Sequence, residues 1–144
     1  MRIIIPDSPE LFNLYFNLRY EVLRKPWNQP YSSVKDDLEE SSMHAMLLDE
    51  QDQIAGVCRM HFNSEEEVQL RFMAIRPDLQ GKGYGKLLLD YFEDLATSHK
   101  RKRIMLQARE DAVSFYLRNG YEVKEKSYLM WGIIQHFRME KTII

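Results

Sequence analysis

The sequence predicts a mixed α+β fold, and two observations on the order of its elements lead to that class. First, three strand-like runs are joined by short polar turns, which allow only antiparallel neighbours. These runs cover residues 43–48, 53–62 and 68–75. Second, a helical pattern over residues 84–99 is followed by a strand at 103–108, so the middle of the chain forms a strand–helix–strand crossover.

The N-terminal residues add one strand and one helix to this pattern. Residues 2–5 are predicted to form a strand that Pro6 closes. Ser8 has the right side chain for an N-cap, and Pro9 suits the first position of a helix. Apolar residues then recur at helical spacing, and the helix is expected to end near Lys25.

Less regular segments lie on both sides of the crossover. Residues 26–42 contain two prolines and an acidic cluster, and they are predicted to form a long loop with room for one short helix. A helix over 111–119 should end at Gly120, which is the usual residue just beyond a helix C-terminus. Two final strands are expected at 121–126 and 133–141.

Composition describes an ordinary globular chain. Hydrophobic residues make up 44% of the 144 residues and charged residues 29%, and the formal net charge is −2. The basic run at 100–103 fits a solvated helix C-terminus better than a polyanion site. No run approaches the ~20 apolar residues of a membrane span, and the first residues stop being apolar too soon for a signal peptide. We therefore expect a cytoplasmic protein with no membrane or nucleic-acid partner.

Cysteine and histidine usage gives no sign of a metal or a disulfide. Cys58 is the only cysteine, so the chain cannot form an internal disulfide, which fits a reducing compartment. Because Cys58 lies in an apolar strand-like run, a buried and inert thiol is the favoured interpretation over a nucleophile. The histidines show no metal-ligand spacing, and we predict no metal site. They are His44, His61, His99 and His136.

The most informative segment is a turn with three glycines in five residues, directly before a predicted helix. It reads Gln80-Gly81-Lys82-Gly83-Tyr84-Gly85-Lys86. Glycines let a ligand approach the backbone closely, and the first amides of the helix can donate to an anion. Lys82 and Lys86 add positive charge. The segment therefore predicts a cradle for a phosphate or pyrophosphate, the alternative being a tight turn without a ligand.

Two common phosphate motifs do not fit this segment. A P-loop needs Ser or Thr after its lysine, where this chain has Leu87. The dinucleotide fingerprint needs Gly-x-Gly-x-x-Gly after an early strand of a parallel sheet, whereas the glycines here follow an antiparallel meander at 81, 83 and 85. Neither motif therefore identifies the ligand of this turn.

The turn resembles the Gln/Arg-x-x-Gly-x-Gly/Ala loop of the GNAT superfamily of acetyl-CoA-dependent N-acyltransferases. A second segment resembles that family's Ala-x-x-Phe-Tyr-x-x-x-Gly-Phe/Tyr helix and strand. It reads Ala112-Val113-Ser114-Phe115-Tyr116-Leu117-Arg118-Asn119-Gly120-Tyr121. The resemblance covers nearly the whole chain. It implies one domain over residues 1–144, with a central, mostly antiparallel twisted sheet flanked by helices and a strand–helix–strand core that binds acetyl-CoA.

The resemblance also implies roles for particular residues. Main-chain groups of Met73 and Ile75 would pair with the pantetheine arm, and donors near Met73 and Ala74 would hold the oxyanion. Tyr116 would protonate the departing thiolate, because a phenol with a pKa of about 10 keeps its proton at neutral pH. Helical spacing alone, without the motif, favours a packing role, in which the Tyr116 ring packs its helix onto the sheet. Amides from Gly81 to Lys86 would hold the pyrophosphate. The cofactor-binding candidates of this segment are Gln80, Gly81, Lys82, Gly83, Tyr84, Gly85 and Lys86.

Two positions depart from the family pattern. Arg109 stands where many members have an asparagine that helps to hold the pantetheine, and we retain it as a cofactor-binding candidate. Gln69 stands where some members have a glutamate base, and an amide cannot usefully accept a proton. The base would then be another group, a water chain, or solvent acting on a neutral amine. His61 is the candidate among the histidines.

The acceptor site is expected in the N-terminal part of the chain. Residues 18–24 and 26–30 resemble the ElaA-like branch of the superfamily. Aromatic residues between prolines suit a ligand wall or an anchor for the loop. The acidic cluster of Asp36, Asp37, Glu39 and Glu40 either attracts a cationic amine or forms a solvated face. The substrate-binding candidates are Arg19, Trp27, Gln29 and Tyr31.

The sequence therefore predicts an enzyme that moves an acetyl group from acetyl-CoA to an amine of a small molecule or peptide. Direct transfer in a ternary complex is expected, because no residue is placed as an obvious covalent relay. The alternative is a non-catalytic acyl-CoA-binding sensor or interaction module, which the glutamine at position 69 supports and Tyr116 opposes. The last strand, over 133–141, offers an edge through which a homodimer could form.

Overall fold

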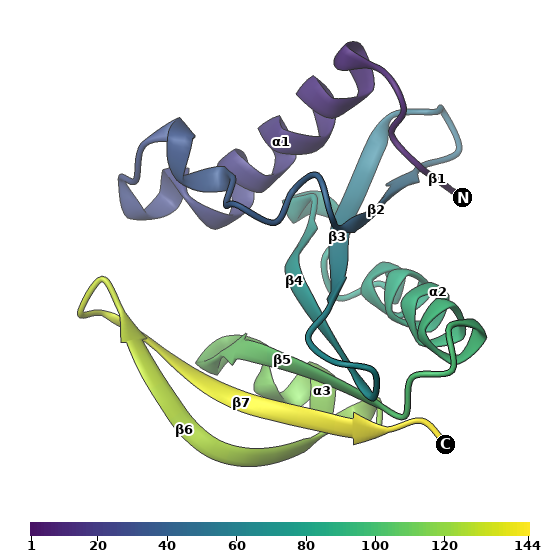
Figure 1. The fold of residues 1–144 in the computed structure, drawn as a ribbon. Coiled ribbons are helices and arrows are strands. Elements are labelled where there is room, and N and C mark those ends of the chain that lie inside the picture. Colours follow the sequence, from purple (N-terminus) through teal and green to yellow (C-terminus); the bar gives the residue numbers. More distant parts are fainter. The chain divides into compact units, whose positions relative to one another are not determined.

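The computed structural model describes the whole chain, Met1–Ile144 (Figure 1). The strands are β1 (Arg2–Ile4), β2 (Met43–Leu48), β3 (Ile54–Phe62), β4 (Glu67–Ile75), β5 (Arg103–Arg109), β6 (Glu122–Met130) and β7 (Ile134–Thr142). The α-helices are α1 (Pro9–Leu23), α2 (Tyr84–Ser98) and α3 (Val113–Arg118). Short 3-10 helices are η1 (Lys25–Trp27), η2 (Tyr31–Val34), η3 (Pro77–Leu79) and η4 (Glu110–Ala112).

The seven strands follow the order β1-β2-β3-β4-β5-β7-β6, and most pairs are antiparallel. β4 and β5 are parallel, with Val68 opposite Ile104, because α2 returns the chain between them. The mixed fold and the central crossover predicted from the sequence are thus confirmed. The chain divides into two compact units, each described separately below. The first comprises Met1–His61 and Phe72–Phe92, and the second Phe62–Arg71 and Glu93–Ile144.

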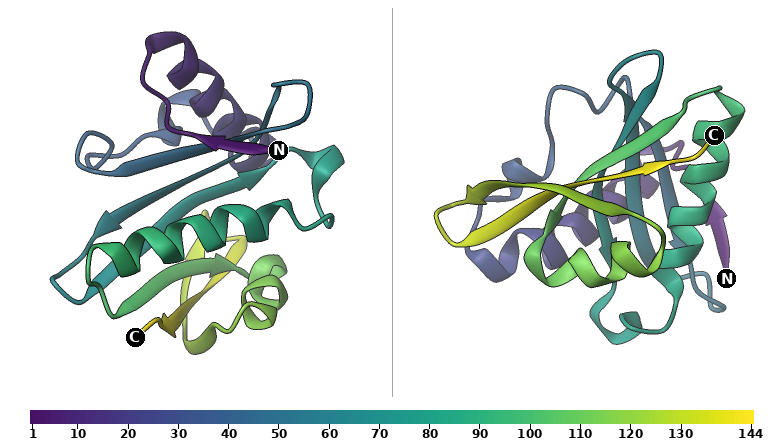
Figure 2. Two further views of the ribbon diagram at one scale, coloured as in Figure 1. Left: turned by 90° about the vertical axis from the view of Figure 1, so that its right-hand side faces the viewer. Right: turned by 90° about the horizontal axis from the view of Figure 1, so that it is seen from below.

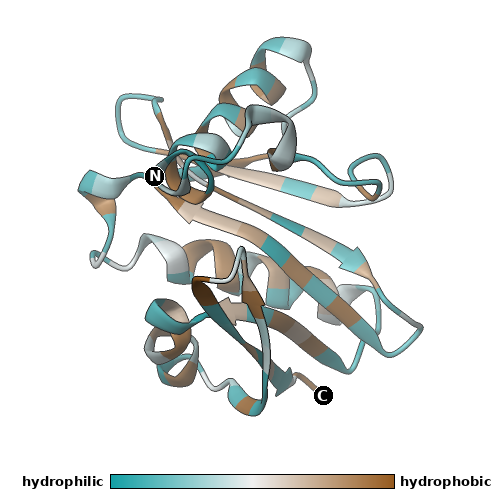
Figure 3. Ribbon diagram, turned by 90° about the vertical axis from the view of Figure 1, so that its left-hand side faces the viewer, coloured by the Kyte–Doolittle hydropathy of each residue, from teal (hydrophilic) through white to brown (hydrophobic).

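In the first unit, α1 packs against one face of the strands. Most residues of β2 and β3 are buried, and Figure 3 shows how hydrophobic positions are distributed along the strands. The core joins Tyr15, Phe16 and Leu18 of α1 to Met46, Leu48, Val57 and Ala74 of the strands. Full burial of an apolar side chain of this size contributes about 1.5–3 kcal/mol. This core therefore fixes α1 on β2 and β3.

The start of α1 has the predicted cap. Ser8 is extended, and its side-chain oxygen accepts a hydrogen bond from the Leu11 amide at 3.2 Å. Pro9 takes the first helical position, where its missing amide hydrogen costs nothing. At the other end, Arg24 is the C-cap and its amide donates to the Tyr20 carbonyl. The predicted limits of this helix are confirmed.

In the second unit, β7 pairs with β5 on one side and with β6 on the other, and α3 lies against β5 and β6 (Figure 2). Gly120 ends α3 in a left-handed conformation, with a φ of 90°. Its amide donates to the Leu117 carbonyl, and the Tyr121 amide donates to the Tyr116 carbonyl at 3.0 Å. This pair of bonds is a Schellman motif. The glycine stop predicted at this helix is confirmed.

Four details of the sequence prediction were wrong. β6 continues to Met130, because its second half pairs with β7 across a shifted register. The helix expected over 111–119 is divided into η4 and the shorter α3. β7 cannot offer an edge to a dimer partner, because both its edges are hydrogen-bonded within the chain. The loop at 26–42 holds two 3-10 helices rather than one short helix.

None of the three α-helices is both long enough and apolar enough to cross a membrane.

Candidate functional site

The glycine turn of the first unit is open, and its conformation requires glycine. Gly81 and Gly83 have φ values of 76° and 90°, which side chains of L-residues rarely adopt. No other heavy atom lies within 4 Å of the position that a Cβ would take at either residue. The Gln80 side-chain amide donates to the Ile75 carbonyl at 2.9 Å and so connects the turn to the end of β4. A ligand can therefore reach the main chain of Gly81 and Gly83.

The turn leads directly into α2, which begins at Tyr84 and runs for 15 residues. Its first turn contains no acidic residue, so nothing opposes an anion at the positive end of the helix. Lys82 is exposed, and the Lys86 ammonium forms an ion pair with Asp90 one turn further along, at 2.7 Å. The turn therefore combines accessible main-chain groups, a helix N-terminus and two lysines, which is the chemistry that a phosphate-binding site needs.

The strand before this turn contains a conformational irregularity. Phe72, in the second half of β4, has a φ of 58°, although it is neither glycine nor asparagine. Beyond it, Met73 and Ile75 are half-buried, while Ala74 belongs to the core under α1. The irregularity thus directly precedes Met73, Ala74 and Ile75, the three residues of β4 expected to bind the cofactor. No signal in the sequence predicted it.

Two fully buried arginines of the first unit lie next to Phe72. Arg19 of α1 and Arg59 of β3 have no exposed surface, and both bond to the Glu39 carboxylate, at 3.0 and 2.8 Å. Arg59 also pairs with Asp36. Removing one partner from such a buried pair typically costs about 3–5 kcal/mol. These bonds therefore hold the 36–39 segment firmly against α1 and β3.

This arrangement corrects two interpretations of the sequence. Arg19, expected to bind the acceptor, is instead an interior residue that donates to the Val34 carbonyl and to Glu39. The acidic cluster is not one solvated face, because Asp36 and Glu39 neutralise the buried arginines while Asp37 and Glu40 remain exposed. The partner arginines lie about twenty positions away in the sequence, so local patterns could not reveal the pairing.

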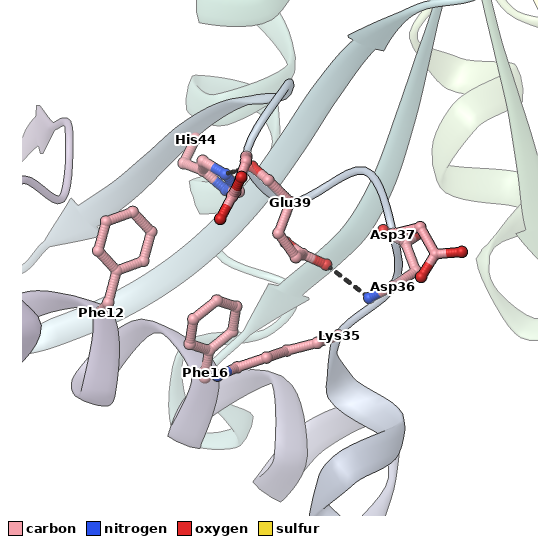
Figure 4. A pocket seen from close by; sticks show the side chains of 8 residues that line it. Phe12, Phe16, Lys35, Asp36, Asp37, Glu39 and His44 are labelled. Carbon is pink, nitrogen blue, oxygen red and sulfur yellow. Dashed lines mark hydrogen bonds between the residues drawn. The ribbon is translucent and has the colours of Figure 1, made fainter.

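An open pocket of about 460 Å³ lies between α1, the acidic segment and the start of β2 (Figure 4). The rings of Phe12 and Phe16 form its wall on α1, and the Lys35 ammonium lies 4.5 Å from the centre of the Phe16 ring. On the β2 side, both nitrogens of His44 are engaged, with the Tyr15 hydroxyl at 2.8 Å and the Glu39 carbonyl at 2.7 Å. Burial lowers the pKa of His44 below its usual value.

The remaining acceptor candidates lie on the loop after α1. Trp27 is half-buried in η1, and its carbonyl accepts a hydrogen bond from the Gln29 side chain. Tyr31 is 42% exposed, and its hydroxyl donates to Asn17 at 2.7 Å. Partial burial raises the pKa of the Tyr31 phenol. These three candidates are near one another in the sequence and present partly accessible polar and aromatic groups.

Tyr116 belongs to the second unit. Its side chain is 7% exposed, and its ring makes edge contacts with Phe115 and Tyr121 at centroid distances of 5.0 and 5.6 Å. Arg109 ends β5, opposite His136 of β7. Burial lowers the pKa of the Arg109 guanidinium, while Asp111 and Tyr128 act in the opposite direction.

The structure also describes the groups near Gln69. The Asn63 side-chain amide bridges Gln69 and the carboxylate of Glu67. Glu67 accepts hydrogen bonds from Arg103 and Arg138, and despite its burial these bonds keep its pKa below the usual value. A carboxylate held in this way is a weak base, so Glu67 does not replace the missing glutamate.

His61, the histidine suggested as an alternative base, belongs to the first unit. It is buried, and its Nδ1 lies 3.4 Å from a guanidinium nitrogen of Arg59. No group of three or more His, Cys, Asp or Glu side chains in the chain could hold a metal ion.

The strand order and the glycine turn after β4 place this chain in the class of acyl-CoA-dependent N-acyltransferases. A family model described as an acetyltransferase (GNAT) domain matches residues 18–143. The chain therefore belongs to the GNAT acetyltransferase family, with acetyl-CoA as its co-substrate.

Relatives and solved structures agree with this assignment along the whole chain. The chain is 29% identical over 143 residues to YjcF of Bacillus subtilis (strain 168), described as an uncharacterized N-acetyltransferase, covering 98% of this chain and 99% of YjcF. It is also similar to the crystal structure of Escherichia coli ElaA, with a TM-score of 0.81, 21% identity and 97% of each chain covered. An aminoglycoside 6'-N-acetyltransferase complexed with coenzyme A gives a TM-score of 0.83 at 18% identity, covering 100% of this chain and 98% of that one.

Proposed function

We propose that this protein transfers the acetyl group of acetyl-CoA directly to an amine of a small molecule or peptide, within a ternary complex. The observation that carries the proposal is the open turn with Gly81 and Gly83 at positive φ, directly before the N-terminus of α2. Turns that only reverse the chain also use glycines at positive φ, but this turn adds two lysines and leads directly into a helix N-terminus, and both features suit an anion.

In this proposal the cofactor binds along the end of β4 and the turn. The amides between Gly81 and Lys86 hold the pyrophosphate, with Lys82 adding positive charge. Main-chain groups of Met73 and Ile75 pair with the pantetheine arm as an added strand would. Gln80 supports this arrangement indirectly, because its bond to the Ile75 carbonyl joins the turn to the strand. Arg109 is retained as a further candidate for cofactor binding.

The chemistry requires one new bond and one proton donor. The neutral amine attacks the thioester carbon, an N–C bond forms, and the developing oxyanion accepts hydrogen bonds from main-chain donors near Met73 and Ala74. The C–S bond then breaks, and Tyr116 protonates the departing thiolate. The proton lost by the amine leaves to solvent or to a water chain, because Gln69 cannot accept it and Glu67 is held by two arginines.

The acceptor is proposed to bind near the loop that follows α1, at Trp27, Gln29 and Tyr31. Their partial exposure supports this role, whereas Arg19 is left out because it has no exposed surface. Three of the structurally similar proteins are described as aminoglycoside 6'-acetyltransferases, which supports an amine as the acceptor group.

The test measures binding and turnover separately. Calorimetry with coenzyme A and acetyl-CoA is expected to show one site per chain. Release of the CoA thiol is then followed with a panel of primary amines that includes polyamines, aminoglycosides and peptides with a free N-terminus. Faster thiol release with one class of amine, together with the acetylated amine in the mass spectrum, is the expected result. Cofactor binding without acetylation of any amine would favour a sensor, and absence of binding would refute the proposal.

Direct transfer also predicts that Cys58 plays no part in the reaction. The thiol is fully buried in β3, so it cannot meet the thioester without local unfolding. We expect the Cys58→Ala variant to turn over at a rate close to that of the wild type. Mass spectrometry of the wild-type protein mixed with acetyl-CoA, without an amine, should show no acetylated protein. An acetyl adduct that disappears in the variant would contradict direct transfer.

A further inference from the structure

The arginine directly after β4 bonds to the β2–β3 turn, to the start of β3 and to η3. The backbone amide of Arg76 donates to the Ala55 carbonyl, and its Nη1 donates to the Ile54 carbonyl, both at 2.8 Å. Its Nη2 donates to the Asp49 carboxylate at 3.1 Å, and its Nε donates to Asp78 at 2.7 Å. One side chain of the first unit therefore ties the short helix η3 to the neighbouring strand and turn.

The Asp49 carboxylate is a fixed partner for this guanidinium. Its Oδ1 accepts hydrogen bonds from the amides of Gln51 and Gln53, both at 2.9 Å, while its Oδ2 accepts from Arg76. The bonds from Gln53, Gln51 and Arg76 keep the pKa of Asp49 below its usual value, so the carboxylate is charged at neutral pH. One oxygen therefore stabilises the β2–β3 turn, and the other binds Arg76.

Local hydrogen bonds extend this anchoring to the glycine turn. The Leu79 amide donates to the Arg76 carbonyl at 2.9 Å, and the Gln80 amide donates to the Pro77 carbonyl at 3.3 Å. Gly81 comes next in the chain. The segment from Arg76 to Gln80 is thus the fixed end from which the glycine turn starts.

The glycine turn depends on its two ends because its middle is open. No other heavy atom lies within 4 Å of the Cβ positions at Gly81 and Gly83. The far end is held by α2, whose Leu88 and Phe92 are fully buried. The near end is held by Arg76. A site that is competent for only part of the time loses affinity in proportion to that fraction.

We propose that Arg76 is a positioning residue for the cofactor: by bonding Asp49 and Asp78 at once, it holds η3 so that the main chain of the glycine turn is presented to the pyrophosphate. The inference rests on the proposed function, in which this turn holds the pyrophosphate. Arg76 acts through η3 and does not contact the phosphates itself. The β2–β3 turn thereby contributes to cofactor affinity through the Asp49 carboxylate.

Asp49→Asn is the variant that tests this most sharply. The new side chain keeps an oxygen for the amides of Gln51 and Gln53, but its NH₂ group faces the Arg76 donor, so that bond is lost. Removing a negative charge by itself favours an anionic ligand, whereas a mobile η3 disfavours it. Calorimetry should show about tenfold weaker binding of coenzyme A, as for a turn that is competent about a tenth of the time. Unchanged or tighter binding would overturn the proposal, and tighter binding would indicate direct contact between Arg76 and the phosphates.

Asp52→Asn is the matched control. Asp52 lies in the same turn and pairs with Arg2 at 3.2 Å, so the substitution also removes one negative charge and one ion pair. It leaves Arg76 and its partners unchanged, and coenzyme A should bind as tightly as to the wild type. Equal losses of affinity in Asp52→Asn and Asp49→Asn would contradict the proposal.

A double-mutant cycle measures the coupling between the two side chains. Arg76→Ala should weaken the binding of coenzyme A at least as much as Asp49→Asn does. The protein with both substitutions should bind no more weakly than Arg76→Ala alone, because the same bond is already absent. Additive losses would show that Asp49 and Arg76 act independently, and the proposal would then be wrong.

A purely structural role for Arg76 predicts a different result. It would lower the midpoint of thermal unfolding and leave the affinity unchanged at temperatures well below that midpoint. The proposal instead expects the KM for acetyl-CoA to rise about tenfold in Asp49→Asn, with kcat at saturation within about twofold of the wild type, because the pyrophosphate contacts are the same before and during the reaction. A lower kcat at unchanged KM would contradict it.

Two further measurements complete the test. If Asp49→Asn does not fold, Asp78→Ala breaks the second bond at a carboxylate that is 65% exposed, and it should also weaken the binding of coenzyme A. Unchanged or tighter binding in Asp78→Ala would refute the proposal. Wild-type protein that does not bind coenzyme A refutes the proposed function, whereas normal wild-type binding with unchanged affinity in Asp49→Asn and Asp78→Ala refutes only this inference.

Discussion

Replacing Tyr116 by phenylalanine should lower the rate of acetyl transfer by about 10²–10⁴, with little change in the affinity for acetyl-CoA. The substitution removes only the hydroxyl group, so the ring contacts with Phe115 and Tyr121 are kept. A thiolate that leaves without a proton is a poorer leaving group, and the loss should therefore fall on kcat. Single-turnover measurement with the most active amine is the proper readout, because product release can hide a slower chemical step.

The pH dependence gives an independent check on Tyr116. A general acid acts in its protonated form, so the wild-type rate should fall as the pH rises through the pKa of that acid. The Tyr116→Phe variant has no phenol at this position, and the alkaline limb of its pH–rate profile should be absent or altered.

Tyr121→Phe is the matched control for Tyr116→Phe. Tyr121 is also a buried tyrosine of the second unit, and its hydroxyl donates to Glu93 at 3.0 Å. Losing this bond should cost about 1 kcal/mol of stability and leave the transfer rate close to that of the wild type. If Tyr116→Phe instead reacts within about twofold of the wild type in single turnover, Tyr116 is a packing residue and the proton comes from water.

Replacing Gly83 by leucine should weaken the binding of coenzyme A at least tenfold, which corresponds to about 1.4 kcal/mol. A side chain at a φ of 90° is strained, and it also occupies the space through which the pyrophosphate would reach the amides. No other atom lies within 4 Å of the added Cβ, so the fold should be retained. Calorimetry measures the affinity, and thermal unfolding checks the fold.

Gly132→Leu controls for strain alone. Gly132 lies in the turn between β6 and β7, has a φ of 71°, and likewise has open space around its Cβ position. This variant should lose a similar amount of stability and bind coenzyme A as the wild type does. Unchanged affinity in Gly83→Leu would remove the observation on which the proposed function rests.

Local signals predicted much of the fold. Ser8 and Pro9 marked the start of α1, and Gly120 marked the end of α3, because caps act within a few residues of the chain. The second half of β6 carried no comparable signal. Its pairing with β7 depends on residues across the hairpin, including the stacking of Tyr128 on His136 at 4.4 Å.

The candidate site was predictable only in part. The glycine turn was evident from its composition, and its positive φ angles confirm the reason for glycine at positions 81 and 83. The left-handed Phe72 was not predictable, since phenylalanine has no preference for that region and the enforcing contacts come from other elements. For the same reason Arg19 was assigned to the acceptor, although it is fully buried.

The sequence by itself determined the order of the elements, the caps and the glycine turn, because each depends on neighbours a few positions away. Only the tertiary structure decided which charges are buried together. Arg59 meets Asp36 and Glu39 across 23 and 20 positions of the chain, and the guanidinium groups meet Phe72 from two separate segments, α1 with its C-cap and β3. Such contacts form only when the core brings α1, β3 and β4 together, since the burial of apolar side chains supplies the free energy that offsets the desolvation of the charges.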